Sequence, residues 1–455
     1  MNKDPTALSR ILRISVPAVI STLSGNLMMF LDRVFLSRYS LEDFSVAMPG
    51  GMLSFTVATL FIGIGWYVPS LVAQYYGADR PKDAARAVWQ GIYFSFAAGV
   101  ILLIASPFAV KLLATEGRPH ATIVLAQNYF YLTMGANIVS MVTVCIGGFF
   151  NGRGETRIPM AANIAANVLN AVLAYICING LFGIPLHGVT GAGVATLIAS
   201  AANLLFHAAF FFNRHYRTMA YTTQAMQFDG AMMKKLLYFG FPSALQNFID
   251  IGGWGIFIMF IEQTGRNAMA AASIAFNIEM IAFMPVMGLA SGVGIIAGQE
   301  MGAKRPDNVW RVTRKGIAVA LGFNAVLAAL FIVVPGLFIM PFNNPNDSSF
   351  AAVQALALPL IRIVAAWVLF NAVLMTLMSV LRSAGDTFFI MVATSVSAPL
   401  FLVLPAYFII LKFRLGLEMT FWLIVAYIIL LFFVILVRFL QGKWRFMQVI
   451  ESEYS

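Results

Sequence analysis

The chain contains about twelve apolar runs of roughly 20 residues or more, separated by short charged or turn-rich connections. Hydrophobic residues make up 60% of the 455 residues and charged residues only 11%, whereas about a quarter of the residues in a soluble domain are charged. This combination excludes a water-soluble globular protein. The predicted spans are 11–38, 46–76, 86–114, 121–149, 157–183, 189–213, 236–264, 268–300, 310–341, 350–381, 387–413 and 417–440.

The length of these runs distinguishes the two structures that can cross a bilayer. Strands of a membrane barrel are about ten residues long and alternate apolar and polar side chains, whereas these runs are longer and uniformly apolar. The sequence therefore predicts an all-α integral membrane protein with twelve transmembrane helices. The connections leave no room for a soluble enzyme domain.

The basic residues predict the orientation of the helices. Most of the 29 Lys and Arg residues lie near the two ends of the chain and in the even-numbered connections. The positive-inside rule therefore places both termini in the cytoplasm. The net charge of +10 is then a signal of topology, and we expect no nucleic-acid partner. On the side of the membrane opposite the cytoplasm, the predicted topology places seven basic residues: Arg33, Arg38, Lys111, Arg118, Arg266, Lys412 and Arg414. Arg362 falls inside a span.

The second half of the chain repeats the first at a constant offset, which aligns Pro17 with Pro242. Gln-Tyr-Tyr-Gly-Ala-Asp-Arg-Pro at 74–81 recurs at this offset as Gln-Glu-Met-Gly-Ala-Lys-Arg-Pro at 299–306. Six spans return the chain to its starting side, so we expect two six-helix lobes related by a pseudo-twofold axis along the membrane normal. The predicted lobes are 1–220 and 235–441, with a linker at 221–234 and a cytoplasmic tail at 442–455.

We interpret the repeated Gly-Ala-x-Arg-Pro motif as a helix end followed by a turn. Glycine permits the turn, and proline resists continuation of the helix. A looser echo pairs Arg-Gly-Glu-Thr at 153–156 with Ala-Gly-Asp-Thr at 384–387.

Several short motifs occur in an order that resembles the multidrug and toxic compound extrusion (MATE) family, with NorM-like and DinF-like members. The resemblance implies a cation-coupled antiporter of the bacterial inner membrane that exports organic, often cationic, compounds. It covers nearly the whole chain. The motifs are Phe30-Leu31-Asp32, Leu41-Glu42-Asp43-Phe44, Gly-Ala-Asp-Arg-Pro at 77–81, Asn151-Gly152-Arg153-Gly154-Glu155-Thr156-Arg157, Gly191-Ala192-Gly193-Val194-Ala195-Thr196 and Leu381-Arg382-Ser383-Ala384-Gly385-Asp386-Thr387.

Asp32 is the principal candidate for ion coupling, because an unpaired charge inside a span costs several kcal/mol. It matches the carboxylate that the family carries on its first helix, and Pro17 matches a family proline that can act as a hinge. The alternative is an interfacial carboxylate paired with Arg33 or Arg38. Adjacent residues of a helix point in different directions, which disfavours Arg33.

Neutral oxygens in spans 4 to 6 could complete a cation site beside Asp32. The candidates are Asn137, Asn163, Asn167, Asn170 and Thr196, of which the three amides from 163 to 170 share a helix face. The alternative is hydrogen bonding between helices. Family members that bind sodium have a carboxylate where this chain has Ala174, so protons are favoured over sodium.

The second lobe supplies candidates for a substrate site or a second cation site. They are Asp250, Gln246, Asn277, Glu279, Asn371 and Arg362. Asp250 and Asn277 match positions of the NorM-like pattern, whereas Asn371 stands where such members tend to carry an aspartate. The alternative is that Asp250 and Glu279 pair with Arg362.

Other functional classes fit the sequence less well. A flippase for a lipid-linked oligosaccharide is the nearest alternative, but it calls for a strongly basic cavity. The four histidines form no ligand cluster, so we expect no metal and no cofactor beyond a coupling H⁺ or Na⁺, and no enzymatic activity. The expected partners are small organic cations or amphiphiles and the bilayer, and we expect a monomer.

Overall fold

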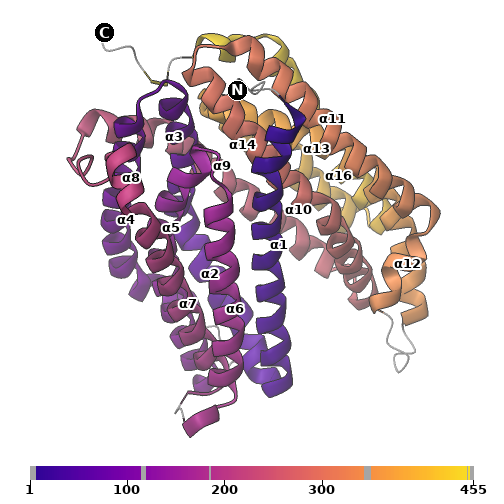
Figure 1. Cartoon of the computed structure of the whole chain (residues 1–455). Coiled ribbons are helices and arrows are strands. Elements are labelled where there is room, and N and C mark those ends of the chain that lie inside the picture. The colour runs from indigo at the N-terminus through magenta and orange to yellow at the C-terminus, as the bar shows by residue number, and fades with distance from the viewer. Residues whose placement is uncertain (1–6, 114–118, 184–185, 343–349, 448, 451–455) are drawn as a thin grey trace. The chain divides into compact units, whose positions relative to one another are not determined.

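The computed structural model describes residues 7–113, 119–183, 186–342, 350–447 and 449–450 (Figure 1). Lys3, Arg118, and residues 448 and 451–455 of the predicted tail lie outside this part. Its α-helices are α1 (Leu8–Tyr39), α2 (Leu41–Gly65), α3 (Val68–Gly77), α4 (Pro81–Ala109), α5 (His120–Gly152), α6 (Arg157–Ile178), α7 (Gly188–Phe211), α8 (Arg214–Met219), α9 (Gly230–Glu262), α10 (Arg266–Gly302), α11 (Pro306–Val333), α12 (Pro335–Ile339), α13 (Phe350–Ala384), α14 (Thr387–Ser397), α15 (Leu404–Ala406) and α16 (Leu417–Leu440).

Short 3₁₀-helices and two π-helical segments complete the regular structure. The 3₁₀-helices are Val110–Leu113, Leu181–Gly183, Met340–Phe342 and Lys443–Phe446, and the π-helical segments are Ala398–Val403 and Tyr407–Lys412. Among the described residues, 12 helical segments are long and apolar enough to cross a membrane. The predicted all-α fold with twelve transmembrane helices is confirmed.

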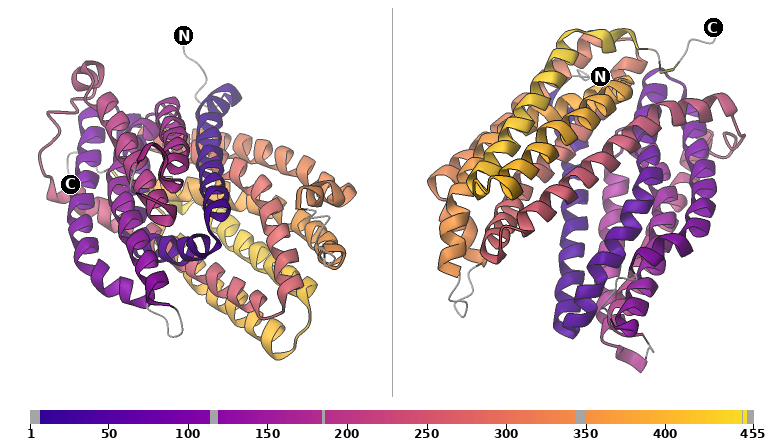
Figure 2. Two further views of the ribbon diagram at one scale, coloured as in Figure 1. Left: turned by 90° about the horizontal axis from the view of Figure 1, so that it is seen from below. Right: turned by 180° about the vertical axis from the view of Figure 1, so that it is seen from behind.

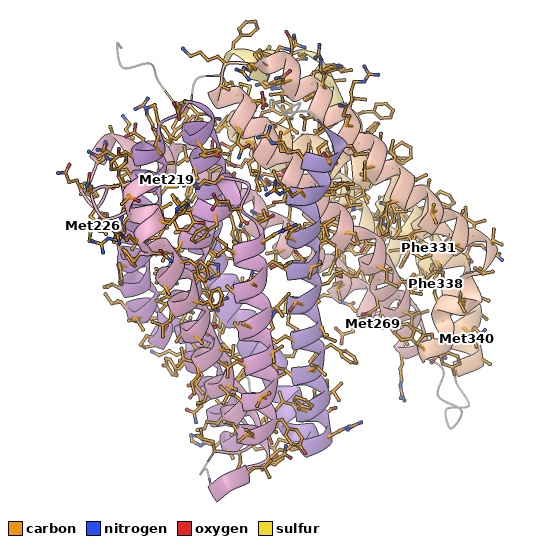
Figure 3. The ribbon with its side chains drawn as sticks, viewed as in Figure 1. Met219, Met226, Met269, Phe331, Phe338 and Met340 are labelled. Atoms are coloured by element: carbon orange, nitrogen blue, oxygen red, sulfur yellow. The ribbon has the colours of Figure 1, made fainter. Side chains whose placement is uncertain are left out.

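Proline interrupts three of the predicted spans. The expected helix 46–76 breaks at Trp66–Tyr67 just before Pro69, which has no backbone N–H to donate to the preceding turn. The expected helix 310–341 breaks at Val334 before Pro335. Across that break the rings of Phe331 and Phe338, labelled in Figure 3, meet edge to face with centroids 4.9 Å apart. The expected helix 387–413 passes through the two π-helical segments near its own prolines.

The chain divides into two compact units. Unit 1 comprises Met1–Val19, Gln246–Ala297 and Arg305–Gln448, and unit 2 comprises Ile20–Leu245, Gly298–Lys304 and Val449–Ser455. Within unit 2, α2, α4 and α7 pack on α5, and α6 packs on α7; within unit 1, α11 and α16 pack on α13 (Figure 2). The lobe limits expected from the repeat stay a prediction.

Helices α1 and α9 pass from one unit to the other shortly after their matched prolines. In α1 the boundary follows Val19, two residues after Pro17, and in α9 it follows Leu245, three residues after Pro242. The first part of each helix is therefore packed with residues of the other repeat.

Glycines at matched positions of the repeat let the first parts of α1 and α9 pack closely against neighbouring helices. In unit 1, a Cβ atom built at Gly288 would lie 2.7 Å from the backbone nitrogen of Val19. In unit 2, a Cβ atom built at Gly63 would lie 2.7 Å from the Cα of Ala244. Gly63 and Gly288 are matched by the same offset as Pro17 and Pro242, and so are Val19 and Ala244. The repeat in the sequence is therefore also a repeat in packing.

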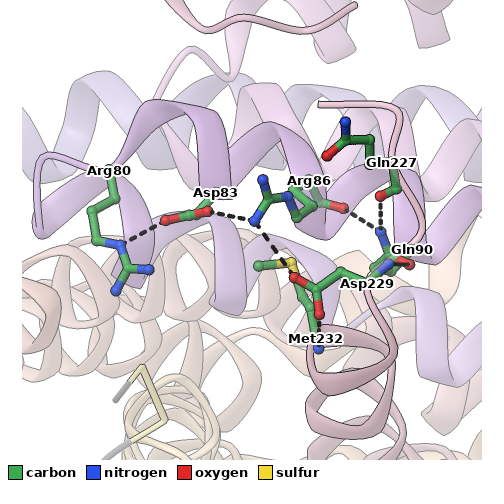
Figure 4. Close-up of polar contacts among 7 residues, drawn as sticks. All are labelled: Arg80, Asp83, Arg86, Gln90, Gln227, Asp229 and Met232. Atoms are coloured by element: carbon green, nitrogen blue, oxygen red, sulfur yellow. Dashed lines mark hydrogen bonds and ion pairs between the residues drawn. The ribbon is translucent and has the colours of Figure 1, made fainter. Parts of the chain in front are cut away.

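The connection between α8 and α9 is held against α4 through its own backbone (Figure 4). The Trp89 indole donates to the Thr222 carbonyl at 2.7 Å, and the Gln90 amide donates to the Gln227 carbonyl at 3.1 Å. The Tyr93 hydroxyl donates to the carbonyl of Met226. Side chains of α4 thus bind three backbone carbonyls of the connection and fix its path.

Asp229 extends this contact into α9. One carboxylate oxygen accepts the backbone N–H of Met232 at 3.0 Å, which caps the first turn of α9, and the other lies 3.5 Å from Arg86 of α4. Residues 230–234 of the predicted linker are thus the start of α9. We call the contacts of Trp89, Gln90, Tyr93 and Arg86 with residues 222–229 the linker clamp.

The turn after the repeated glycine differs from the prediction. The left-handed backbone conformation falls at Asp79 and Lys304, each with φ of 57°, and not at Gly77 or Gly302. The interpretation that glycine permits the turn is therefore wrong for these two residues. In the looser echo, by contrast, the glycines themselves adopt the left-handed conformation, with φ of 80° at Gly154 and 102° at Gly385.

Candidate functional site

Asp32 lies on α1 in unit 2 and is half-buried. With the Asn170 amide oriented to suit its neighbours, its nitrogen donates to Asp32 Oδ1 at 3.0 Å, and its oxygen accepts from the Thr196 hydroxyl at 3.3 Å. Asn170 itself is fully buried on α6. The structure therefore brings together three of the predicted residues from α1, α6 and α7.

Tyr129 of α5 also interacts electrostatically with Asp32. In the described part of the chain, no ion pair joins Asp32 to Arg33 or Arg38, which disfavours the alternative of an interfacial pair. Neutral amide and hydroxyl groups can hydrogen-bond a carboxyl group in either charge state. This site can therefore accept a proton or a cation without losing all its protein contacts.

Two further asparagines hold the preceding turns of α1 alongside α6. Asn163 Nδ2 donates to Ser21 Oγ at 2.7 Å, and Asn167 Nδ2 donates to Ser24 Oγ at 2.8 Å. Asn203 of α7 donates to Asn163 Oδ1 at 2.9 Å. Asn163, Asn167 and Asn170 share a helix face as predicted, and the first two form the interhelical bonds of the alternative interpretation.

Asn137 points elsewhere. Its amide donates to Ser54 Oγ of α2 at 2.9 Å, so α5 is joined to α2 at this level. The structure therefore does not bring Asn137 into the group around Asp32.

Asp250 has a different environment in unit 1. Gln246 Nε2, one helical turn earlier on α9, donates to Asp250 Oδ2 at 3.1 Å. Gln246 Oε1 accepts from the Arg382 guanidinium at 3.0 Å. Gln246 is thus a bridge between a carboxylate and a guanidinium, and Tyr427 of α16 also interacts electrostatically with Asp250.

The other candidates of unit 1 do not join this group. Glu279 has a hydrogen bond with the Trp367 side chain, whereas exposed Asn277 donates to the Ser273 carbonyl of its own helix at 2.8 Å. Asn371 is buried on α13. Arg362 is exposed, and within the described residues no ion pair connects it with Asp250 or Glu279. The alternative pairing with Arg362 is therefore not observed.

Sequence reasoning missed Ser21, Ser24, Tyr129, Arg382 and Tyr427. The two serines had one available signal, because they lie three residues apart on the helix that carries Asp32. Arg382 falls between the predicted spans 350–381 and 387–413, yet it lies in the last turn of α13. The tyrosines could not be distinguished in a chain whose aromatic content is 13%.

The echo motif places an acid at equivalent turns with different partners. Asp386 is buried and accepts two bonds from Arg438, at 2.6 and 3.0 Å. Glu155 lies 3.0 Å from Arg153 and accepts the Tyr216 hydroxyl at 2.7 Å. The side chain of Glu155 is 33% exposed, whereas that of Asp386 is 3% exposed.

Comparison with known proteins places this chain in a family. The MatE family model matches residues 17–176 and 242–408, and the two segments begin at the repeated prolines. A probable multidrug resistance protein NorM from Thermotoga maritima is 26% identical over 99% of this chain and 96% of its own length. Another protein of that name, from Oceanobacillus iheyensis, is 27% identical over 70% of this chain and 72% of its own length.

Solved structures share the fold. A MOP superfamily transporter from Pyrococcus furiosus has a TM-score of 0.85 at 21% identity, over 99% of this chain and 98% of that chain. An outward-facing multidrug resistance MATE family transporter has a TM-score of 0.86 at 20% identity, with the same coverage. With the family model matching well over half of its residues, the chain is a multi-pass membrane protein that belongs to the MATE family of transporters.

Proposed function

We propose that this protein is a cation-coupled antiporter that exports organic, often cationic, compounds by alternating access. The observation that carries the proposal is Asp32, held half-buried inside a span among neutral partners on α6 and α7. A charged carboxylate in this position costs several kcal/mol unless a protein partner or a bound ion compensates its charge. Family membership and relatives named as multidrug resistance proteins support the export of drugs or toxic metabolites.

The chemistry of antiport follows from competition for this carboxylate. A proton or cation on Asp32 neutralises its charge, and a cationic substrate needs the charge. If the two bind to different states of one site, each releases the other, because a ligand shifts an equilibrium only through its differential affinity.

Protons are favoured over sodium as the coupling ion. Sodium prefers several oxygen ligands, and the position of the second carboxylate in sodium-coupled relatives is Ala174 here. In unit 1, Asn371 likewise has no charge, and the Arg382 guanidinium is connected to Asp250 through Gln246. Neither group therefore offers a pair of carboxylates to sodium.

We further propose that the protein lies in the bacterial inner membrane, with both termini in the cytoplasm, and functions as a monomer. The excess of basic residues in the even-numbered connections supports this orientation. Binding partners are small organic cations or amphiphiles, and no cofactor is required beyond the coupling ion.

The test uses the purified full chain in proteoliposomes with a fluorescent organic cation. We expect transport driven by a pH gradient to continue when sodium is replaced by another monovalent cation. Asp32→Asn should strongly reduce this transport, while Asp307→Asn, which changes an exposed carboxylate at the start of α11, should not. Undiminished gradient-driven transport by Asp32→Asn would contradict the proposal. Translocation that follows a lipid headgroup and ignores the cation would favour the flippase instead.

A further inference from the structure

The ends of α3 and α10 form a reciprocal contact at the repeated Gln-x-x-Gly motif. A Cβ atom built at Gly77 would overlap the backbone carbonyl oxygen of Gln299, and one built at Gly302 would overlap that of Gln74. The offset that relates the two halves of the sequence exchanges these two contacts. All four residues belong to unit 2, although most of α10 belongs to unit 1.

The carbonyl oxygens in this contact already serve their own helices. Ala78 N donates to Gln74 O at 3.0 Å, and Ala303 N donates to Gln299 O at 2.9 Å. Each oxygen then faces the Cα of the partner glycine, which offers it only a weak C–H···O contact. Such a contact separates with little loss of enthalpy and without a change of rotamer.

A third helix end completes the contact. The Gln299 side chain is buried and donates to the Gly152 carbonyl at the end of α5 at 2.7 Å. Gly152 is itself close-packed, because a Cβ atom there would lie 2.6 Å from the Pro69 carbonyl oxygen of α3. Glycine thus brings the ends of α3 and α10 into backbone contact, and the end of α5 into backbone contact with the first turn of α3.

The next residue anchors two of these ends to each other. The Arg153 guanidinium lies over the rings of Tyr76 and Phe149, 5.1 and 5.0 Å from their centroids, and over Tyr216 at 5.6 Å. Arg153 is buried. The ends of α3 and α5 are therefore fixed to one another, whereas the end of α10 is seated on them by the glycine contacts and the Gln299 hydrogen bond.

We propose that the Gly77–Gln299 and Gly302–Gln74 contacts form a latch that closes one end of the transport path and opens once in each cycle. The inference rests on the proposed alternating access, which requires contacts at one end of the protein to be made and broken. Glycine at both positions is needed for closure, since any larger residue holds the carbonyl away. Opening costs the Gln299 bond to Gly152, which water can replace.

The experiment measures the latch by the distance between spin labels. Lys82, in the first turn of α4, and Lys304, directly after α10, are exposed residues of the same unit as the latch. Cysteines at these positions, in the full chain with Cys145 and Cys177 replaced, carry the labels in lipid nanodiscs. We expect a population at short distance, the closed latch, and one at longer distance.

Gly77→Ala and Gly302→Ala should each reduce the short-distance population about tenfold relative to the longer one, because an inserted methyl group in a close-packed contact is costly. Gly322→Ala is the matched control, since a Cβ atom there meets nothing within 4 Å. Gln299→Ala adds no bulk and removes the bond to Gly152, so it should reduce the short population severalfold. Gln299→Ala decides the outcome if Gly77→Ala and Gly302→Ala do not fold.

An unchanged distance distribution in folded Gly77→Ala and Gly302→Ala, or in Gln299→Ala if they do not fold, would overturn the latch. The measurement needs neither substrate nor a gradient. Failure of the parent chain to transport an organic cation would therefore count against the proposed function only, whereas an unchanged distribution counts against the latch only.

Discussion

Asp32 and Asp250 are half-buried carboxylates on the first helix of each repeat, and their partners differ. Asp32 meets the amide of Asn170 and, beyond it, the hydroxyl of Thr196. Asp250 meets the amide of Gln246, which is in turn bonded to the guanidinium of Arg382. The two repeats therefore place a carboxylate on the equivalent helix, but the charges around that carboxylate differ between them.

This difference teaches that the two repeats need not perform the same chemistry. The group around Asp32 contains neutral partners, so a proton or cation is the charge that can compensate it. The group around Asp250 already contains a positive charge one hydrogen bond further away. We expect coupling to depend mainly on the first repeat.

The largest expected effect separates the two carboxylates. Asp32→Asn should reduce gradient-driven efflux by about 5- to 150-fold, the range of typical coupling free energies. Asp250→Asn should reduce it less, because the neighbouring Arg382 keeps part of the electrostatic environment. Initial rates of dye efflux from proteoliposomes measure both variants, with protein content and orientation matched. Equal losses in the two variants would remove the proposed asymmetry.

A second comparison uses the acids of the echo motif. Asp386→Asn should destabilise the protein by about 3–5 kcal/mol, because it leaves the partly buried Arg438 without its charged partner. Glu155→Gln should cost less, since Glu155 is more exposed and the buried Arg153 keeps its cation–π contacts with the rings of Tyr76, Phe149 and Tyr216. Thermal unfolding in detergent, followed by circular dichroism, measures both. A larger loss for Glu155→Gln would show that exposure does not control the cost.

The linker clamp provides a third comparison, between tryptophans of the two units. Trp89→Phe removes the donor to the Thr222 carbonyl and should cost about 1–3 kcal/mol, the penalty of an unsatisfied buried group. Trp310 stacks on Phe439 with centroids 5.1 Å apart, and Trp310→Phe keeps a stacking ring and should cost less. Limited proteolysis of residues 220–229 in each variant tests whether the segment is released.

The smallest effect concerns alkaline pH. Burial and the hydrogen bond to Glu155 raise the pKa of the Tyr216 hydroxyl above its usual value. An unfolded tyrosine ionises near about pH 10, so this contribution is complete below that pH and declines as the pH rises further. Tyr216→Phe should lower stability by about 1 kcal/mol at neutral pH and reduce the decline above about pH 10. Melting temperatures between neutral and alkaline pH, with Tyr221→Phe as the exposed control, measure both changes.

Much of the fold could be predicted because hydropathy and charge act over whole spans. The twelve spans, the repeat of the two halves and the candidate Asp32 need only residue type and spacing. The breaks at Trp66–Tyr67 and Val334 lie within apolar runs, so averaged hydropathy cannot show them, although Pro69 and Pro335 were available as local signals.

The contacts between distant elements could not be predicted in the same way. The linker clamp recognises the carbonyls of Thr222, Met226 and Gln227, and a backbone group carries no sequence signal. Gly77 and Gly302 are visible in the sequence, but a glycine needed for close approach is indistinguishable there from a glycine needed for a turn. The bonds from Asn163 and Asn167 needed the neighbouring helix to be placed first.

The exchange of helix segments between the units also bears on biosynthesis. The ribosome produces α1 first, yet the Ser15 hydroxyl bonds to the Leu289 carbonyl, 274 residues later in the chain. The first part of α1 therefore waits in the membrane without its final neighbours until α10 has been inserted. The N-terminal half of the chain cannot complete its own packing during translation, and the last steps of assembly involve both halves at once.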